Sequence, residues 1–173
     1  KYIERFDEDG SINESNNQFN ERDNLMLWHT DIFVCDGSEK QEFYPLFCYH
    51  GFRYVKIENA PEDIEVCAET AHTDLEKIGS FKCNDEMLNS IHSATTRSIL
   101  TNYYGIPTDC PHREQNGWTG DAQLSSEAAL MNFDMVSAYR KWMDDFKDMQ
   151  RPNGQLPGVI PSADWGFNFG SGP

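Results

Sequence analysis

Residues 106–121 read Ile106-Pro107-Thr108-Asp109-Cys110-Pro111-His112-Arg113-Glu114-Gln115-Asn116-Gly117-Trp118-Thr119-Gly120-Asp121. Prolines restrict the backbone at the start of this stretch, and glycines permit unusual turns near its end. Its three carboxylates would be costly to bury together without partners, so the stretch is not ordinary core. We interpret it as an irregular loop, either a solvated surface loop or a functional site.

The residue types in this loop favour a functional site. Trp118 follows Gly117 and is close in sequence to three carboxylates. A flat aromatic ring can cover the apolar face of a pyranose while carboxylates accept hydrogen bonds from its hydroxyls. Two carboxyl groups on opposite sides of a glycosidic bond can also cleave that bond. The alternative role for Trp118 is a hydrophobic plug that holds the loop down, and the two roles are compatible.

The stretches at 107–114 and 117–122 closely resemble the signature of bacterial α-L-rhamnosidases of glycoside hydrolase family 78. Shorter stretches at 49–54, 79–81, 141–142 and 152–154 also look like that family, so the resemblance extends over nearly all of the chain. The resemblance implies an N-terminal β-sandwich portion followed by the first helices of an (α/α)6 barrel.

The resemblance also implies roles for single residues of the loop. Glu114 takes the place of the general acid, Asp109 and Asp121 line the sugar site, and Trp118 contacts the rhamnose. Arg113 is placed with the substrate-binding residues, where it would order the loop by pairing with a carboxylate. Some relatives carry one extra residue between the Arg and the Gly-Trp pair. This chain has the shorter form, so the acid is assigned to Glu114 rather than Gln115, and the general base is expected beyond Pro173.

Composition narrows the classes of partner. The 173 residues include 29 acidic and 14 basic side chains, which gives a net charge of −15. This charge argues against binding to a nucleic-acid backbone or to an anionic membrane surface. No run of eighteen apolar residues is present, so no transmembrane helix is expected. The expected partner is a rhamnose-containing glycoside or polysaccharide, as the resemblance implies.

Nothing in the sequence predicts a metal or another cofactor. The five cysteines are widely spaced without a C-x-x-C pair, and we expect buried free thiols. Cys110 lies inside the loop but has no clearly placed histidine base, so a nucleophilic role is not expected. Residues 7–10 read as a plain turn rather than a calcium loop. The chain begins at Lys1 without a signal segment, so we expect a piece of a longer protein and leave its localisation open.

Residues 1–78 are expected to form the β-sandwich portion. Short runs of β-branched and aromatic residues separated by turn residues are typical of such a fold. The expected strands are 25–28, 31–34, 42–47, 52–57 and 64–68. The single histidines His50 and His72 are expected to be structural rather than ligands.

Residues 79–173 are expected to be helical and to contain the loop. Asn84 is expected to cap a first helix, a second should begin near Asp121, and Asp134 is expected to cap a third. The negative charge of Asp121 would then interact favourably with the positive end of the helix dipole, and this role is an alternative to binding substrate. The apolar stripe of the third helix comprises Met135, Tyr139, Trp142, Met143 and Phe146, and its expected ion pairs are Arg140–Asp144 and Lys141–Asp145. The aromatic tail at 163–170 is expected to form part of a binding wall in an intact enzyme, and the alternative is a disordered tail in this stretch alone.

Two hypotheses of different classes follow. In the first, the chain is part of an enzyme that hydrolyses terminal α-L-rhamnosides with inversion. In that case this stretch alone would be inactive because it lacks the base. In the second, the chain is a non-catalytic carbohydrate-binding module, in which the β portion binds sugar and the helices support it.

Overall fold

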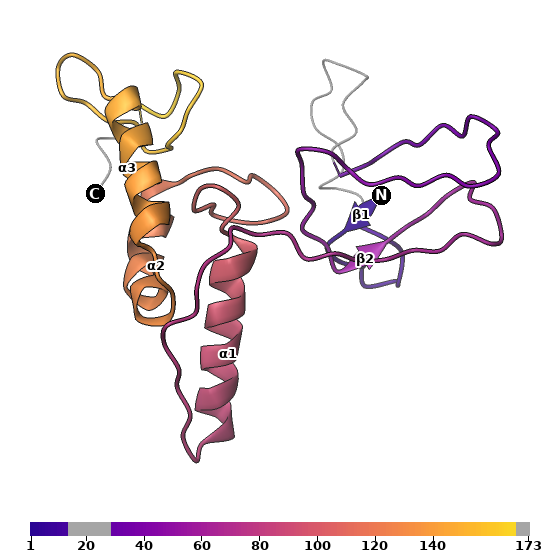
Figure 1. Cartoon of the computed structure of the whole chain (residues 1–173), viewed down its shortest axis with the longest axis horizontal. Helices are drawn as coiled ribbons and strands as arrows, with labels where there is room; N and C mark the ends of the chain where they lie inside the picture. The colour runs from indigo at the N-terminus through magenta and orange to yellow at the C-terminus, as the bar shows by residue number, and fades with distance from the viewer. Residues whose placement is uncertain (14–28, 169–173) are drawn as a thin grey trace. The chain divides into compact units, whose positions relative to one another are not determined.

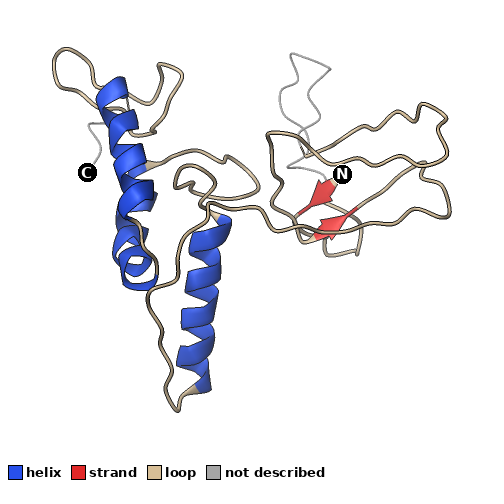
Figure 2. Ribbon diagram, in the orientation of Figure 1, coloured by secondary structure: helices blue, strands red, loops and turns tan. Residues whose placement is uncertain are grey.

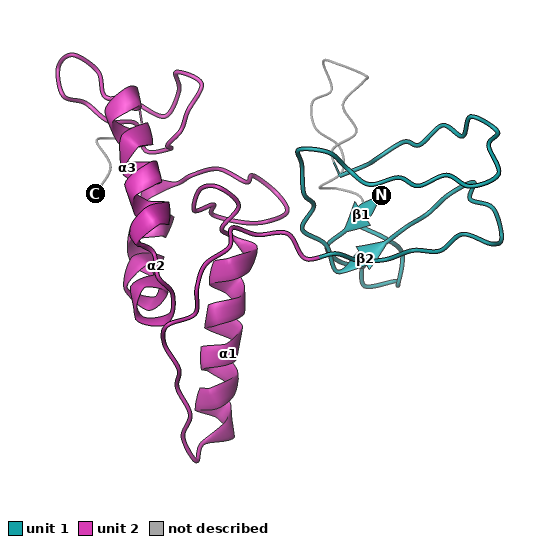
Figure 3. Ribbon diagram, in the orientation of Figure 1, with its two compact units in different colours: residues 1–69 teal, residues 70–173 magenta. Residues whose placement is uncertain are grey.

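The computed structural model describes residues 1–13 and 29–168. The chain forms two compact units, residues 1–69 and residues 70–173 (Figure 3). The domain boundary expected after residue 78 stays a prediction. All three described helices belong to the second unit, and the two described strands belong to the first (Figure 2).

The first unit is tied together by a short antiparallel pair. Strand β1 (Tyr2–Ile3) pairs with β2 (Tyr54–Val55), with Tyr2 opposite Val55 and Ile3 opposite Tyr54 (Figure 1). Backbone hydrogen bonds from Arg53 N to Ile3 O (2.9 Å) and from Lys56 N to Lys1 O (2.9 Å) lie beside the pair. Ile3 is fully buried, which gives this unit an apolar anchor.

Tyr2 organises a polar cluster next to this anchor. Its ring stacks on His50 with centroids 3.9 Å apart, and its hydroxyl donates to Asp31 Oδ2 at 2.7 Å. His50 Nε2 lies 3.2 Å from the same Asp31 oxygen. Burial, with a further contribution from the Asp31 carboxylate, raises the pKa of Tyr2 well above its usual range. His50 therefore has a structural role, as the sequence predicted.

Most of the expected strands are not strands in the structure. Residues 31–34, 42–47 and 64–68 form no strand pairing with any other described residue, and the expected strand 52–57 is reduced to Tyr54–Val55. The expected strand 25–28 lies outside the described residues. An extended segment becomes a strand only when another segment supplies backbone hydrogen bonds, and the sequence pattern could not show which segments have such a partner.

The second unit begins its helical part with α1 (Glu86–Thr101). The N-cap is Asp85, whose Oδ1 accepts hydrogen bonds from Met87 N at 2.8 Å and Leu88 N at 3.4 Å. The expectation that Asn84 caps this helix was therefore wrong by one residue. Both residue types are good caps, and only the backbone conformation decides between adjacent ones.

Helices α2 (Thr119–Asn132) and α3 (Val136–Met149) follow the loop and are joined by a short connection. The N-cap of α3 is Met135, so the expectation that Asp134 caps this helix was wrong by one residue, although Asp134 Oδ1 accepts a hydrogen bond from Val136 N at 3.0 Å. Asp134 N also donates to Glu76 O at 2.9 Å, so this connection is held against the segment that precedes α1.

Two apolar clusters form the core of the second unit. The first contains Leu75, Tyr103, Ala129, Phe133 and Met135, and the second contains Ala122, Trp142 and Ile160. The expected apolar stripe of α3 is confirmed at Met135 and Trp142, which are 1% and 5% exposed. Met143 is 43% exposed, so its place in the core was predicted wrongly.

The predicted ion pairs of α3 and the predicted burial of the cysteines are confirmed only in part. The expected pair Lys141–Asp145 forms at 2.6 Å, whereas Asp144 pairs with Lys147 at 2.6 Å instead of Arg140. All five cysteines are free, but Cys35, Cys48 and Cys67 are exposed rather than buried. None of the helices in the described ranges is both long enough and apolar enough to cross a membrane.

Candidate functional site

Both ends of the loop are fixed by backbone hydrogen bonds within the second unit. At the start, Thr108 N donates to Asn102 O at 2.7 Å. At the end, Ile160 N donates to Gly117 O at 2.8 Å and Thr119 N donates to Gly158 O at 3.0 Å. The loop between the first two helices is therefore held by the segment that follows α3, which is distant in sequence.

Gly117 permits the closest approach of these two segments. A Cβ atom at this position would lie 2.0 Å from Ile160 O, a backbone atom that cannot rotate away. Trp142, buried in α3, donates its indole N–H to the same carbonyl oxygen at 2.9 Å. The contact with Ile160 therefore fixes the backbone at Gly117 and so helps to position Trp118, the next residue.

Asp109 closes the loop on itself. Its Oδ1 accepts a hydrogen bond from Asn116 N at 2.9 Å, and its own backbone N donates to Asn116 O at 3.0 Å. Its other carboxylate oxygen, Oδ2, accepts no hydrogen bond from any residue in the described ranges. One oxygen of Asp109 thus shapes the loop, and the second is available to a ligand.

Glu114 and Trp118 are brought together by this closed loop. The indole Nε1 of Trp118 donates to Glu114 Oε2 at 2.9 Å. Glu114 is exposed, and its backbone N donates to Cys110 Sγ at 3.2 Å. Cys110 thus supports the backbone of Glu114, a contact that the sequence did not indicate. The carboxyl predicted to be the acid is within reach of solvent and of a substrate.

Trp165, which lies in the tail expected to form a binding wall, is in contact with the candidate site. Its ring meets the Trp118 ring edge to face, with centroids 6.0 Å apart and an interplanar angle of 82°. It also lines a hollow of about 270 Å³ together with Arg151, Asp164, Gly166, Phe167 and Asn168. The expected binding wall at 163–170 therefore has one residue, Trp165, in contact with the site, and residues 169–170 lie outside the described residues. The sequence signal was the mixture of aromatic residues and glycines in this tail, which did not indicate which aromatic residue meets Trp118.

Asp121 and Arg113 lie at the surface of the same region. Asp121 is exposed in the first turn of α2, where its charge favours the helix dipole, but it is not the N-cap. The N-cap is Trp118, whose side chain makes no capping hydrogen bond. Arg113 is exposed on the turn that carries Glu114. The structure therefore places all five predicted site residues in one loop and the helix turn after it.

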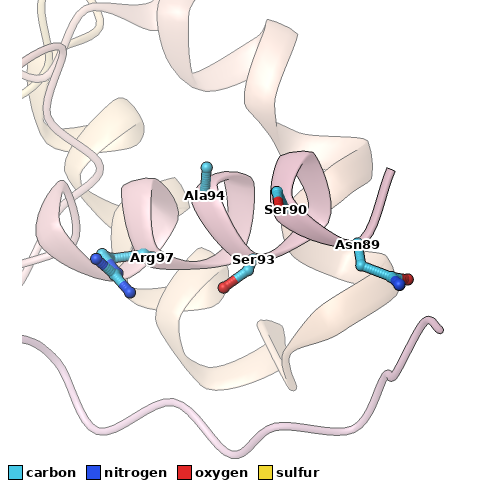
Figure 4. A pocket seen from close by; sticks show the side chains of 5 residues that line it. All are labelled: Asn89, Ser90, Ser93, Ala94 and Arg97. Atoms are coloured by element: carbon cyan, nitrogen blue, oxygen red, sulfur yellow. The ribbon is translucent and has the colours of Figure 1, made fainter. Parts of the chain in front are cut away.

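A second hollow of about 370 Å³ lies on α1 and is unrelated to this loop (Figure 4). Its lining residues come from one face of the helix: Asn89, Ser90, Ser93, Ala94 and Arg97. None of them is a carboxylate, a histidine or a cysteine, so this hollow offers no carboxyl acid and no general base for its two serines. No group of three or more potential metal ligands of the His, Cys, Asp or Glu type occurs among residues 1–13 and 29–168.

Comparison with known proteins gives two adjoining family matches. Residues 1–78 match the bacterial α-L-rhamnosidase concanavalin-like domain, and residues 76–172 match the bacterial α-L-rhamnosidase 6 hairpin glycosidase domain. The predicted fold class, a sandwich portion followed by the start of a helical glycosidase domain, is thereby confirmed.

Single proteins agree with these matches. An α-L-rhamnosidase of Formosa agariphila is 41% identical over 123 residues, which are 69% of this chain and 13% of that protein. The structure of α-L-rhamnosidase from Dictyoglumus thermophilum matches 95% of this chain and 18% of its own with a TM-score of 0.76 at 41% identity. The crystal structure of Streptomyces avermitilis α-L-rhamnosidase complexed with L-rhamnose matches 94% of this chain and 16% of its own chain, with a TM-score of 0.77 at 30% identity.

The chain thus spans less than a fifth of the length of each of these relatives. Within that span, the family matches cover both units, and the loop with Glu114 and Trp118 lies in the glycosidase domain. The chain belongs to the bacterial α-L-rhamnosidase family.

Proposed function

We propose that the full-length gene product hydrolyses terminal α-L-rhamnosides of a rhamnose-containing glycoside or polysaccharide, with inversion at the anomeric carbon. The observation that carries this proposal is the exposed Glu114 carboxyl held at 2.9 Å by Trp118 in a loop of a rhamnosidase-family domain. The relatives named α-L-rhamnosidase and the L-rhamnose in the complex of one of them support the substrate class.

In this mechanism Glu114 protonates the glycosidic oxygen as the bond to the anomeric carbon breaks. A second carboxylate activates water on the opposite face of the sugar, about 6.5–9.5 Å from the acid. We assign that base to a glutamate outside residues 1–173. Asp109 Oδ2 and the Asp121 carboxylate accept hydrogen bonds from sugar hydroxyls, and a face of Trp118 covers the apolar side of the ring.

Arg113 completes the set by pairing with a carboxylate and ordering the turn that carries the acid. Under this assignment, residues 1–173 alone do not hydrolyse rhamnosides, because Glu114 acts only as the acid, Asp109 and Asp121 bind the sugar, and the base lies outside these residues. We also propose that the boundary between the sandwich and catalytic portions lies after residue 78, as the sequence predicts, and the two family matches at residues 1–78 and 76–172 support this.

The test is Glu114→Gln in the full-length gene product. We expect the rate on a rhamnoside with a poor leaving group to fall by about 10²–10⁴-fold, the usual contribution of a positioned acid. Binding of L-rhamnose should remain, because the amide keeps the shape of the carboxyl. The matched control is Glu127→Gln, an exposed glutamate of α2 outside the loop, which should keep wild-type turnover.

Wild-type turnover by Glu114→Gln would contradict the assignment of the acid. Binding of L-rhamnose without any hydrolysis by the unmodified gene product would contradict the proposed enzyme and favour a carbohydrate-binding module.

A further inference from the structure

The hydrogen bond between Trp118 and Glu114 distinguishes the two oxygens of the carboxyl group. Trp118 Nε1 lies 2.9 Å from Glu114 Oε2. An indole nitrogen always carries its hydrogen and cannot accept a hydrogen bond. Oε2 must therefore be the acceptor, in the protonated acid as well as in the carboxylate.

We propose that Trp118 is a positioning residue for the proton donor: its indole N–H holds Oε2 of Glu114 as an acceptor, so that Oε1 carries and delivers the proton. This inference rests on the proposed function, since it specifies how the acid of that reaction works. It adds a second role for Trp118 beside its contact with the sugar.

The proton balance of the step follows from this arrangement. The O–H bond at Oε1 breaks, the proton joins the glycosidic oxygen, and the electron pair of the breaking C–O bond stays on that oxygen. Glu114 is left as a carboxylate that still accepts the indole N–H at Oε2. A hydrogen bond to a charged acceptor is stronger than one to a neutral acceptor. Trp118 therefore stabilises the transition state, in which the charge develops, more than the ground state.

Further contacts hold both Trp118 and Glu114 in place. Trp118 N donates to Asn116 O at 2.9 Å, and Trp118 forms an isolated antiparallel bridge with Val159. The edge-to-face contact with Trp165 limits rotation of the indole ring. On the other side, the Cys110 sulfur accepts the backbone N–H of Glu114 at 3.2 Å. The faces of the indole are distinct from its N–H edge, so stacking on a sugar does not compete with this hydrogen bond.

The first test is Trp118→Phe in the full-length gene product, because phenylalanine keeps an aromatic face and lacks the N–H. For an alkyl rhamnoside, whose leaving group needs a proton, we expect kcat to fall by about 10- to 100-fold. For 4-nitrophenyl rhamnoside, whose leaving group needs little protonation, kcat should fall by about threefold or less. KM for both should stay close to wild type. An equal loss of kcat on both substrates would overturn the proposal.

Trp142→Phe is the matched control. It also removes an indole donor, here the one that holds Ile160 O at 2.9 Å, but it acts on the buried support of the loop rather than on Glu114. We expect a lower melting temperature and an unchanged ratio of kcat between the two substrates. If Trp142→Phe changes that ratio as Trp118→Phe does, general loosening of the loop accounts for the effect and the proposal fails.

A second measurement does not depend on activity. In ¹⁵N-tryptophan-labelled protein, the indole signal that Trp118→Phe removes is assigned to Trp118. Glu114→Ala should move that indole proton signal upfield, because the carboxylate acceptor is lost, whereas Glu127→Ala should leave it in place. An unmoved signal in Glu114→Ala would overturn the proposal. Absence of all rhamnosidase activity with a moved signal would contradict the proposed function and leave the pairing established.

Discussion

At the scale of single residues, Gly117 shows how the loop depends on a segment distant in sequence. A Cβ atom there would lie 2.0 Å from Ile160 O. We expect Gly117→Ala to lower the free energy of unfolding by about 1–3 kcal/mol, the usual cost of forced overpacking, as measured by urea denaturation.

Gly120→Ala is the comparison for this prediction. Nothing lies within 4 Å of a Cβ atom at Gly120, which is in the first turn of α2. Glycine inside a helix is less stable than alanine by about 0.5–1 kcal/mol, so this variant should be as stable as wild type or more stable. Equal destabilisation by the two substitutions would show that the approach to Ile160 is not what Gly117 serves.

Tyr103 gives a prediction about alkaline pH. It is 3% exposed, and its hydroxyl has no hydrogen-bond partner within the described part of the chain. Burial raises the pKa of Tyr103 above its usual range, and Tyr139 and Asp145 add to the shift. An unfolded tyrosine ionises near pH 10, so this contribution to stability is present below about pH 10 and is lost as the pH rises through the folded pKa.

Tyr103→Phe removes this titration together with the unpaired hydroxyl. We expect its melting temperature at pH 7 to equal or exceed that of wild type, because a buried hydroxyl without a partner carries a desolvation cost. Its loss of melting temperature between pH 9 and pH 11 should be smaller than that of wild type. A lower melting temperature at pH 7 would mean that the hydroxyl makes a stabilising contact.

The sequence predicted that the five candidate site residues lie in one stretch, but it did not predict their contacts. Pro107–Asp121 contains all five residues assigned to the site, and the structure keeps them together. That Trp118 donates to Glu114, and that Asp109 binds Asn116, depends on backbone turns at positions such as Gln115, which has a φ of 55°. The sequence placed Trp165 only within the expected wall at 163–170, because the fold rather than the sequence brings this residue to Trp118.

At the scale of elements, the N-cap of α1 was predicted at one residue and is found at the next. The structure assigns the cap to Asp85, whereas the sequence pattern favoured Asn84. We expect Asp85→Ala to lower the free energy of unfolding by about 0.5–2 kcal/mol, because Met87 N and Leu88 N lose their acceptor. Asn84→Ala should lower the free energy of unfolding clearly less. Thermal melts of both variants measure the difference. A larger loss of stability in Asn84→Ala than in Asp85→Ala would show that Asn84 is the cap.

Helices were predicted far better than strands, and the reason is physical. A helix satisfies its backbone within four residues, so the pattern around residues 86–101, 119–132 and 136–149 was sufficient to place it to within a few residues. A strand needs a partner whose place in the chain no local pattern specifies. Tyr54–Val55 has such a partner in Tyr2–Ile3, and residues 31–34 and 42–47 have none in the described ranges.

At the scale of the whole molecule, the two units differ in how much apolar core each contains. Within the described residues, Ile3 is the only buried apolar residue of the first unit, residues 1–69. The second unit, residues 70–173, contains both apolar clusters and all the described helices. Since burial of apolar surface is the main stabilising contribution to folding, we expect the stability of the chain to reside in the second unit.

Separate expression of residues 1–69 and 70–173 tests this expectation. The second unit should keep the helical circular dichroism of residues 1–173 and melt cooperatively, because its clusters join α1, α2 and α3 without help from the first unit. It also exposes Leu124, Met131 and Val136, so it should self-associate as concentration rises in sedimentation experiments. Residues 1–69 should show no cooperative transition, since one buried isoleucine cannot offset the entropy of ordering the chain. A cooperative transition in residues 1–69, or its absence in residues 70–173, would show that the stabilising contacts lie elsewhere.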